Sequence, residues 1–209
     1  MFRLCLVTAI GDRPLDDYLH FLQQAVRGGV DWVEWREKNH PHEKINQAIA
    51  IKKLLDELGA KFLINDYPDI CQKISADGVH LGNDDIAVAE ARRIIGNEKI
   101  IGVSIDDEAD VLRANQNPDI NYITIGAVFH TTSKENVKKI WGIDGLSQMV
   151  KVSQKPTTAI GGIVLDNLPD VMATGVHGVA AVGALHNSGD VYQTAKKFRA
   201  VIDKPAVSS

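Results

Sequence analysis

The chain has 209 residues, of which 44% are hydrophobic and 24% are charged, and its formal net charge is −4 at pH 7. This length predicts one compact domain with a sizeable core, and the interspersed charges of both signs argue against a nucleic-acid-binding surface. The sequence contains no run of eighteen apolar residues, so no membrane span is predicted. The two cysteines, Cys5 and Cys71, are too few for a disulfide framework and are expected in the core.

The first eight residues form a β-like run and lack the basic region and long apolar stretch of a signal peptide. We therefore expect a soluble protein of the cytoplasm. Its expected partners are small molecules, with neither nucleic acid nor a membrane among them. The sequence leaves a homo-oligomer open.

Short apolar runs, most of them containing Val or Ile, recur along the chain and are too short for core helices. We expect strands at residues 3–8, 32–36, 61–65, 78–82, 99–104, 122–128, 157–161 and 178–185. Helical spacing between them predicts helices at 14–27, 42–58, 67–75, 86–95, 106–115, 143–153, 166–174 and 189–202. Three junctions repeat the order of helix end, glycine and buried strand, which is typical of βα repeats.

Eight strands alternating with eight helices predict an α/β protein with a single (β/α)8 TIM barrel domain over residues 1–209. A doubly wound open sheet is the alternative, because a strand count from one sequence can err by an element or two. The barrel is favoured because the first strand begins at residue 3 and a closing helix follows the eighth. In a barrel, the active site lies at the C-terminal ends of the strands.

Charged and polar residues follow several of the expected strands. Asp66 and Asp85 lie just past two consecutive strands, residues 34–38 end an earlier one with a burst of charge, and residues 131–134 follow a later one. Carboxylate oxygens hold Mg2+, whereas Arg, Lys and Asn side chains meet phosphate oxygens. The pattern predicts a site for a metal and a phosphorylated ligand, assembled from several loops.

Two glycines, Gly161 and Gly162, follow the seventh expected strand. Glycine lets a backbone approach a ligand closely. The loops after strands 7 and 8 of a barrel are a frequent phosphate site. This end of the barrel is therefore predicted to bind a phosphate group.

Six segments carry these features in order along the chain: residues 33–38 (VEWREK), 64–67 (INDY), 78–85 (GVHLGNDD), 101–104 (IGVS), 126–134 (GAVFHTTSK) and 159–163 (AIGGI). Together the segments resemble the thiamine-phosphate synthase family, also called thiamine-phosphate pyrophosphorylase, over residues 3–200. The resemblance implies a transferase that joins 4-amino-2-methyl-5-hydroxymethylpyrimidine diphosphate to hydroxyethylthiazole phosphate. It implies that thiamine phosphate and pyrophosphate are released by a dissociative displacement that requires Mg2+.

The resemblance also implies roles for individual residues. Asp66 and Asp85 would be the Mg2+ ligands. The pyrimidine diphosphate would be bound by Glu34, Arg36, Lys38, Asn65, Ser104 and Lys134, among which Ser104, Lys134, Arg36 and Lys38 are the expected catalytic residues. The thiazole phosphate would be bound by Thr131, Thr132, Ser133, Gly162, Val182 and Gly183.

Some positions depart from the family pattern. Glu34 stands where Gln is usual, Gly183 where Ser is typical, and Asp106 where His is frequent. An ionised Glu only accepts hydrogen bonds, whereas a Gln amide also donates. Glu34 could accept from the pyrimidine amine, or stay protonated if it is buried. Asp106 is expected to cap the following helix.

Two alternative functions are considered. A thiazole tautomerase would share the barrel but lack the diphosphate machinery, and the presence of Asn65, Asp66, Asp85 and Lys134 argues against it. A non-catalytic thiazole-phosphate binder is the second, because Glu34 and Gly183 depart from the family.

Other expectations concern the packing of aromatic and histidine side chains. Trp32 and Trp35 should pack against helices, and Trp141 should belong to a lid. His80 should be hydrogen-bonded within the barrel, and His186 should lie at the surface or cap a helix. His130 should adjoin the site.

Overall fold

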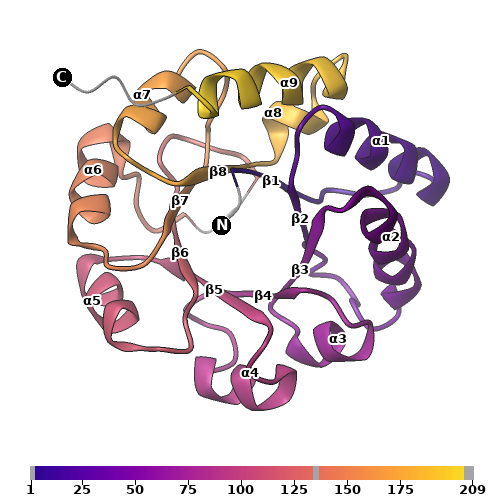
Figure 1. Ribbon diagram of the computed structural model, residues 1–209, viewed down its shortest axis with the longest axis horizontal. Helices are drawn as coiled ribbons and strands as arrows, with labels where there is room; N and C mark the ends of the chain where they lie inside the picture. The colour runs from indigo at the N-terminus through magenta and orange to yellow at the C-terminus, as the bar shows by residue number, and fades with distance from the viewer. Residues whose placement is uncertain (1–2, 134–136, 205–209) are drawn as a thin grey trace.

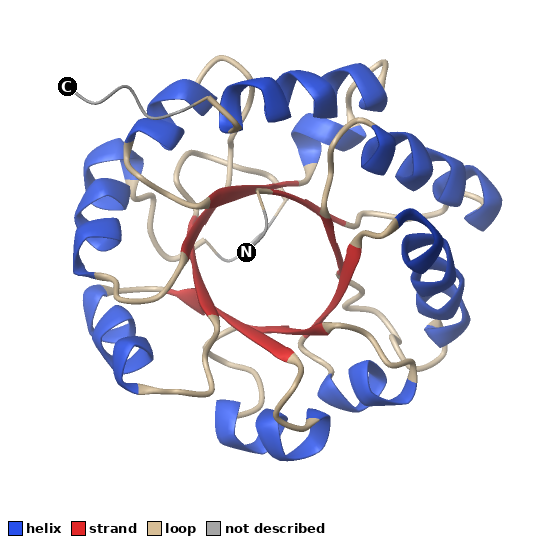
Figure 2. Cartoon of the chain, in the orientation of Figure 1, coloured by secondary structure: helices blue, strands red, loops and turns tan. Residues whose placement is uncertain are grey.

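The computed structural model describes residues 3–133 and 137–204. At its centre is a closed barrel of parallel strands in the order β1 to β8, with β8 paired back to β1 (Figure 1). Helices surround the barrel on the outside (Figure 2). The predicted (β/α)8 fold is confirmed, and the alternative of an open doubly wound sheet is wrong.

The strands are short and lie close to their predicted positions. They span Leu4–Val7 (β1), Trp32–Trp35 (β2), Lys61–Asn65 (β3), Gly78–Leu81 (β4), Ile100–Ile105 (β5), Tyr122–Gly126 (β6), Thr157–Ile160 (β7) and Gly178–Ala181 (β8). Both faces of each strand are covered, one by the barrel interior and one by helices. This explains why the strands read as continuous apolar runs.

The helices cover the outer face of the barrel. They span Leu15–Arg27 (α1), Ile45–Leu58 (α2), Pro68–Lys73 (α3), Val88–Ile95 (α4), Glu108–Gln116 (α5), Gly142–Val152 (α6), Leu168–Ala173 (α7), Gly183–His186 (α8) and Val191–Ile202 (α9). The expected strand 178–185 was too long, because the chain leaves the sheet after Ala181 and forms α8. A short apolar run fits either structure, so its sequence does not decide between them.

The cap of α5 is Asp107, and the expectation that Asp106 caps this helix was wrong. The Asp107 carboxylate accepts a hydrogen bond from the backbone N–H of Asp110 at 2.8 Å, which forms half of a capping box. Asp106 instead pairs with Lys138, 2.7 Å away. Asp106 and Asp107 are adjacent, and an Asp at either position is a typical N-cap residue. Asp107 is the cap because it directly precedes the first helical residue, Glu108, and has an extended backbone.

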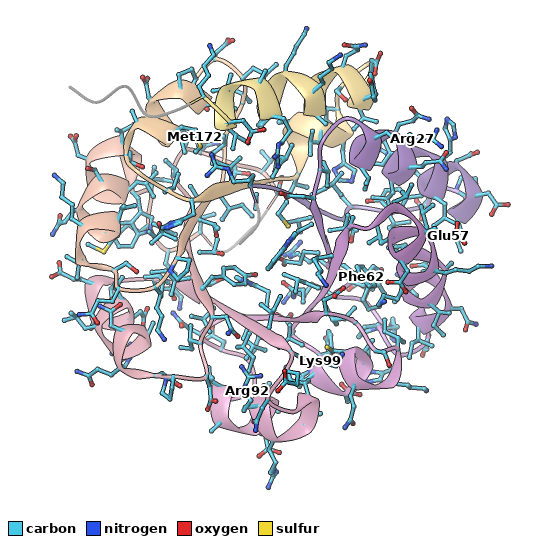
Figure 3. The ribbon with its side chains drawn as sticks, viewed as in Figure 1. Arg27, Glu57, Phe62, Arg92, Lys99 and Met172 are labelled. Carbon is cyan, nitrogen blue, oxygen red and sulfur yellow. The ribbon has the colours of Figure 1, made fainter. Side chains whose placement is uncertain are left out.

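Two apolar layers hold the barrel together. The inner layer contains Cys5, Trp32 and Tyr122, with the Trp32 and Tyr122 rings edge to face at 5.9 Å. The outer layer lies between strands and helices and includes Trp35 and Phe62, the latter on the α2 side of β3 in Figure 3. Because alternate residues of a strand face opposite sides, Trp32 points into the barrel while Trp35 points out. The expectation for Trp35 is confirmed and that for Trp32 is wrong.

Both cysteines are buried, as expected, Cys5 in the inner layer and Cys71 in the outer one. Across the part of the chain that the structure describes, no helix has the length and apolar character needed to cross a membrane.

Candidate active site

Four polar side chains share the inner face of the barrel with the apolar layer. The strand register aligns Glu34 with Leu63, Asn65 with His80, and Ser104 with Thr124. Residues aligned in neighbouring parallel strands point to the same side of the sheet. Leu63 belongs to the inner layer, so strand alternation brings Glu34, Asn65, His80 and Ser104 towards the C-terminal end of the barrel interior.

His80 connects three strands of this face. One ring nitrogen, Nε2, lies 2.9 Å from the Ser104 hydroxyl, and the other, Nδ1, lies 3.0 Å from the Tyr122 hydroxyl. His80 is buried, and its contact with Tyr122 is buried as well, whereas its contact with Ser104 is partly buried. The prediction of a hydrogen-bonded barrel histidine is confirmed, and Ser104 is held in place by it.

The Tyr122 ring occupies the space over Gly102, where any side chain would collide with it. Sequence reasoning missed Tyr122 as a site-supporting residue. The signal was a glycine in β5 next to an aromatic residue in β6, which the register places side by side.

Lys38, Asp66 and Asp85 converge just beyond the C-terminal ends of β2, β3 and β4. Lys38 forms an ion pair with Asp66, whose backbone adopts a left-handed conformation with φ of 68°. The Asp85 carboxylate accepts a hydrogen bond from the backbone N–H of Gly82 at 2.6 Å. The structure thus brings the two expected metal ligands together with one expected diphosphate ligand.

The two carboxyl groups influence each other's pKa in opposite directions. Burial and a hydrogen bond to Asp85 raise the pKa of Asp66 to about 7, although Lys38 opposes this. Burial also disfavours the charged form of Asp85, but hydrogen bonds from Asp66 and from the Gly82 N–H outweigh it and lower the Asp85 pKa. A carboxyl group with a raised pKa loses its proton when a divalent cation binds, because metal ligands bind in their deprotonated form.

The oxygen donors of this pair fit Mg2+. Within residues 3–133 and 137–204, no three His, Cys, Asp or Glu side chains gather into a metal cluster. The protein would therefore supply two carboxylates, and substrate oxygens and water would complete the coordination sphere. Mg2+ is commonly bound in this way, through one or two carboxylates together with substrate phosphates.

Asn65 adds an unpaired donor to the site. The residue is buried at the end of β3, and its side-chain nitrogen has no hydrogen-bond partner among the described residues. An unsatisfied buried donor costs about 1–3 kcal/mol. The amide is therefore suited to an acceptor on a ligand, such as a phosphate oxygen.

Glu34 is buried on β2. Burial raises its pKa to about 7, while the nearby charges of Arg36 and Lys38 act in the opposite direction. Near neutral pH the side chain is therefore partly protonated, and a carboxylic acid both donates and accepts hydrogen bonds. In this form Glu34 has the hydrogen-bonding capacity of a Gln side chain.

Arg36 follows β2 directly, and its backbone is fixed from the neighbouring strand. Its N–H donates a hydrogen bond to the Thr8 hydroxyl at 2.9 Å, and Thr8 is buried at the end of β1. Sequence reasoning missed Thr8, because nothing in the local pattern around it indicates a contact 28 residues along the chain.

The loop after β6 packs against the loop after β7. The N–H of Phe129 donates to the carbonyl of Gly161 at 3.0 Å, and a side chain at Gly162 would meet the carbonyl of His130 at 2.5 Å. Both glycines have positive φ, 101° for Gly161 and 65° for Gly162. Their first role is thus to let the two loops approach closely, and His130 itself is exposed.

Thr131, Thr132 and Ser133 continue the loop after β6, where the Ser133 N–H donates to the Thr131 hydroxyl at 3.2 Å. Thr132 and Ser133 are exposed. Lys134 lies outside the described residues. Further along, the backbone N–H of Trp141 donates to the Ala127 carbonyl at 3.0 Å. The Trp141 side chain is buried and belongs to the packed core.

Val182 and Gly183 follow β8, the strand next to β7. Gly162 and these two residues therefore leave neighbouring strands, as a shared phosphate site requires. His186, at the end of α8, is half-buried and hydrogen-bonded, so the expectation of a surface or capping residue was wrong. Its partner Tyr18 comes from α1, 168 residues away, and no local signal indicates this contact.

Comparison with known proteins gives consistent matches. The family model described as thiamine monophosphate synthase matches residues 4–185. A thiamine-phosphate synthase of Vibrio parahaemolyticus is 40% identical over 203 residues, covering 97% of this chain and 98% of that protein. One of Chlamydia caviae is 36% identical over 204 residues, covering 97% and 96%. The solved thiamine phosphate pyrophosphorylase of Pyrococcus furiosus superimposes with a TM-score of 0.86 at 28% identity, covering 99% and 98%.

Proposed function

This chain belongs to the thiamine monophosphate synthase family, and we propose that it joins 4-amino-2-methyl-5-hydroxymethylpyrimidine diphosphate to hydroxyethylthiazole phosphate. The products are thiamine phosphate and pyrophosphate. The observation that carries the proposal is the convergence of Asp66, Asp85 and Lys38 beside the unpaired Asn65 amide. This set of charges and donors suits a diphosphate bound with a divalent cation.

Asp66 and Asp85 would hold Mg2+, which supplies positive charge to a leaving diphosphate when it is bound. Lys38, Arg36, Asn65 and Lys134 would contact the diphosphate oxygens. Charge on these oxygens grows as the bond to the pyrimidine CH2 breaks, so fixed positive groups stabilise the transition state more than the ground state. The catalytic contribution of the protein is thus mainly electrostatic.

The pyrimidine would lie over the barrel interior, where Glu34 and Ser104 meet its polar edge. An electron-rich aminopyrimidine stabilises positive charge on its CH2 carbon, so diphosphate departure precedes attack by the thiazole nitrogen. The apolar inner layer beneath the site excludes water, which would otherwise compete for this cation. Ser104 is well suited to its role because His80 fixes its hydroxyl.

The thiazole phosphate would lie between the loops that follow β6, β7 and β8. Thr131, Thr132 and Ser133 supply hydroxyl and backbone donors, and the backbone at Gly162, Val182 and Gly183 supplies further N–H groups. Close packing of the first two loops supports a single phosphate site. Such a site holds the thiazole nitrogen near the reacting carbon, which gives the advantage of proximity.

The same account extends to organisation and setting. We assign residues 1–209 to one domain whose active site lies at the C-terminal ends of the strands. Phosphorylated substrates do not cross membranes freely, because burying their charge is costly, so we place the reaction in the cytoplasm. Its partners would be these small phosphorylated molecules.

The purified protein with both substrates and Mg2+ tests the proposal. Thiamine phosphate and pyrophosphate should form in equal amounts, measured by chromatography with mass spectrometry. Omitting the thiazole phosphate, or chelating the metal with EDTA, should abolish thiamine phosphate formation. Failure to form product at saturating substrates and Mg2+ would contradict the proposal.

A further inference from the structure

His186 lies in a small polar network beside the loop that follows β8. Its Nε2 atom is 2.9 Å from the Tyr18 hydroxyl, and its Nδ1 atom is 2.9 Å from the Val182 carbonyl oxygen. The imidazole ring stacks against the Tyr18 ring at 5.9 Å and contacts the Phe21 ring at 5.0 Å. The network therefore ties α1 to the beginning of α8, which lie next to each other in Figure 1.

The direction of each hydrogen bond follows from the partners. The backbone N–H of Ala9 donates to the Tyr18 oxygen at 3.2 Å, so the single hydroxyl hydrogen is available for His186. Nε2 of His186 then accepts this hydrogen, and Nδ1 carries the ring proton and donates to Val182. Burial lowers the His186 pKa and outweighs the opposing effect of the hydrogen bond to Val182, and the charge of Arg13 lowers it further, which favours this neutral form.

The carbonyl that receives this proton is part of the expected phosphate site. The Val182 C=O and the Gly183 N–H belong to one planar peptide unit and point in opposite directions. A group that fixes the carbonyl therefore fixes the N–H as well. The carbonyl also accepts backbone hydrogen bonds from Leu185 at 3.1 Å and His186 at 3.0 Å, but α8 has only four residues. Such a short helix is marginal without tertiary support.

We propose that His186 and Tyr18 are positioning residues that aim the Gly183 N–H at the phosphate of the thiazole substrate. This inference rests on the proposed function, which places that phosphate at Val182 and Gly183. Neither side chain is assigned a contact with substrate. Their contribution is a donor already oriented before the phosphate arrives, which saves the free energy of ordering the loop on binding.

A simpler role for His186 is packing alone. Loss of a packing residue would destabilise the barrel. It would weaken the binding of both substrates to the same extent, or of neither. Loss of a positioning residue would weaken binding of the thiazole phosphate selectively, since the pyrimidine diphosphate is assigned to the ends of β2 to β5 and to Lys134 after β6, and not to the residues after β8. The Michaelis constants for the two substrates therefore separate the two roles.

Two amide substitutions at His186 test the hydrogen bonds of its two ring nitrogens separately. In His186→Asn the amide nitrogen can take the place of Nδ1 and keep the hydrogen bond to Val182. In His186→Gln the longer amide reaches the position of Nε2 and loses that bond. Tyr18→Phe keeps the ring contacts and removes the hydroxyl that faces Nε2. His20→Asn, at an exposed position of α1, serves as the matched control.

We expect His186→Gln to raise the KM for thiazole phosphate about fivefold to tenfold, the size of one ordinary hydrogen bond. The KM for pyrimidine diphosphate should change by less than about twofold on the same scale. His186→Asn should restore most of the thiazole affinity, Tyr18→Phe should show a smaller rise, and His20→Asn should match the wild type. Nitrogen-15 NMR of the wild type should show His186 with its proton on Nδ1.

An unchanged thiazole KM in His186→Gln, or equal changes in both Michaelis constants, would overturn the inference. A proton on Nε2 of His186 would also overturn it. If His186→Gln does not fold, Tyr18→Phe is judged by the same two constants. If the wild-type protein forms no thiamine phosphate, the proposed function itself is refuted. If the wild type forms it and the His186 and Tyr18 variants have normal Michaelis constants, only the positioning role is refuted.

Discussion

The hydroxyl of Thr8, at the end of β1, accepts a hydrogen bond from the backbone N–H of Arg36, just past the end of β2, at 2.9 Å. Thr8 is 2% exposed, so its hydroxyl is held within the barrel wall rather than in solvent. The contact ties the first residue of the charged β2 loop to the barrel wall. It makes the position of Arg36 depend on a side chain that would not touch the substrate.

Thr8→Val should therefore cost stability and activity together. The isosteric methyl leaves the partly buried Arg36 N–H without this acceptor, which lowers the free energy of unfolding by about 1 kcal/mol. The KM for pyrimidine diphosphate should rise because Arg36 is less well fixed. Urea unfolding and steady-state kinetics measure the two effects. Thr8→Ser, which keeps the hydroxyl, is the control, and equal behaviour of both variants would show that the hydrogen bond is unimportant.

Removal of either expected metal ligand should abolish most turnover. Asp66→Ala and Asp85→Ala each leave one carboxylate for Mg2+, while the barrel stays folded. Asp85→Ala should cost about 1 kcal/mol of stability, because the Gly82 N–H loses its acceptor. The neighbouring Asp84 is exposed, so Asp84→Ala should behave as the wild type. Near-normal turnover of both ligand variants at saturating Mg2+ would refute the assignment.

Glu34→Gln should stabilise the protein in a pH-dependent manner. The Glu34 pKa is about 7 in the folded state against 4.5 ordinarily, so between these values the folded state binds more protons and stability falls as pH rises. The full penalty above pH 7 is about 3 kcal/mol. Because Gln carries no charge, the variant should equal the wild type near pH 4.5 and exceed it by up to this amount at pH 8.

Urea unfolding at several pH values measures the difference between the Glu34→Gln variant and the wild type. Other titrating groups are common to the two proteins and cancel. Glu57→Gln is a suitable control, since Glu57 is exposed on the outer face of α2 (Figure 3). A stability difference that does not vary with pH would show that Glu34 ionises normally. Turnover should be retained or raised in Glu34→Gln, because its amide both donates and accepts.

Lys134→Ala should lower kcat more than it raises the KM for thiazole phosphate. The expected partner of Lys134 is the leaving diphosphate, on which charge develops only as the bond breaks. Lys134→Arg should recover part of the loss, since a planar guanidinium replaces a compact ammonium. Kinetics with each substrate varied in turn measures this. An intact kcat with weakened thiazole binding would place Lys134 on the other phosphate.

The barrel and the proximity of Asp66 to Asp85 could be predicted from the sequence because both leave local signals. Buried parallel strands produce Val- and Ile-rich runs, and the C-terminal ends of these strands meet at one end of the barrel. Asp66 and Asp85 therefore had to lie near each other once the strands were recognised. The raised pKa of Asp66 and its pairing with Lys38 required the structure.

Contacts without a local pattern could not be predicted. Trp32 and Trp35 lie in a run that is apolar on both faces, so alternation does not show which of them enters the barrel. His186 and Tyr18 meet only because β8 closes against β1, which brings α1 beside the end of β8. The residues that support the site from behind were missed for this reason, whereas most of those expected to face the substrates left a local signal at a strand end.

The most direct measurement of the central claim is a crystal structure of the protein with Mg2+, pyrophosphate and thiamine phosphate. Mg2+ should lie about 2.0–2.1 Å from carboxylate oxygens of Asp66 and Asp85 and from pyrophosphate oxygens. The Asn65 amide should donate to the pyrophosphate, and the thiamine phosphate group should lie at Gly162 and Gly183. A metal bound away from both carboxylates, or a pyrophosphate outside the C-terminal end of the barrel, would contradict the account.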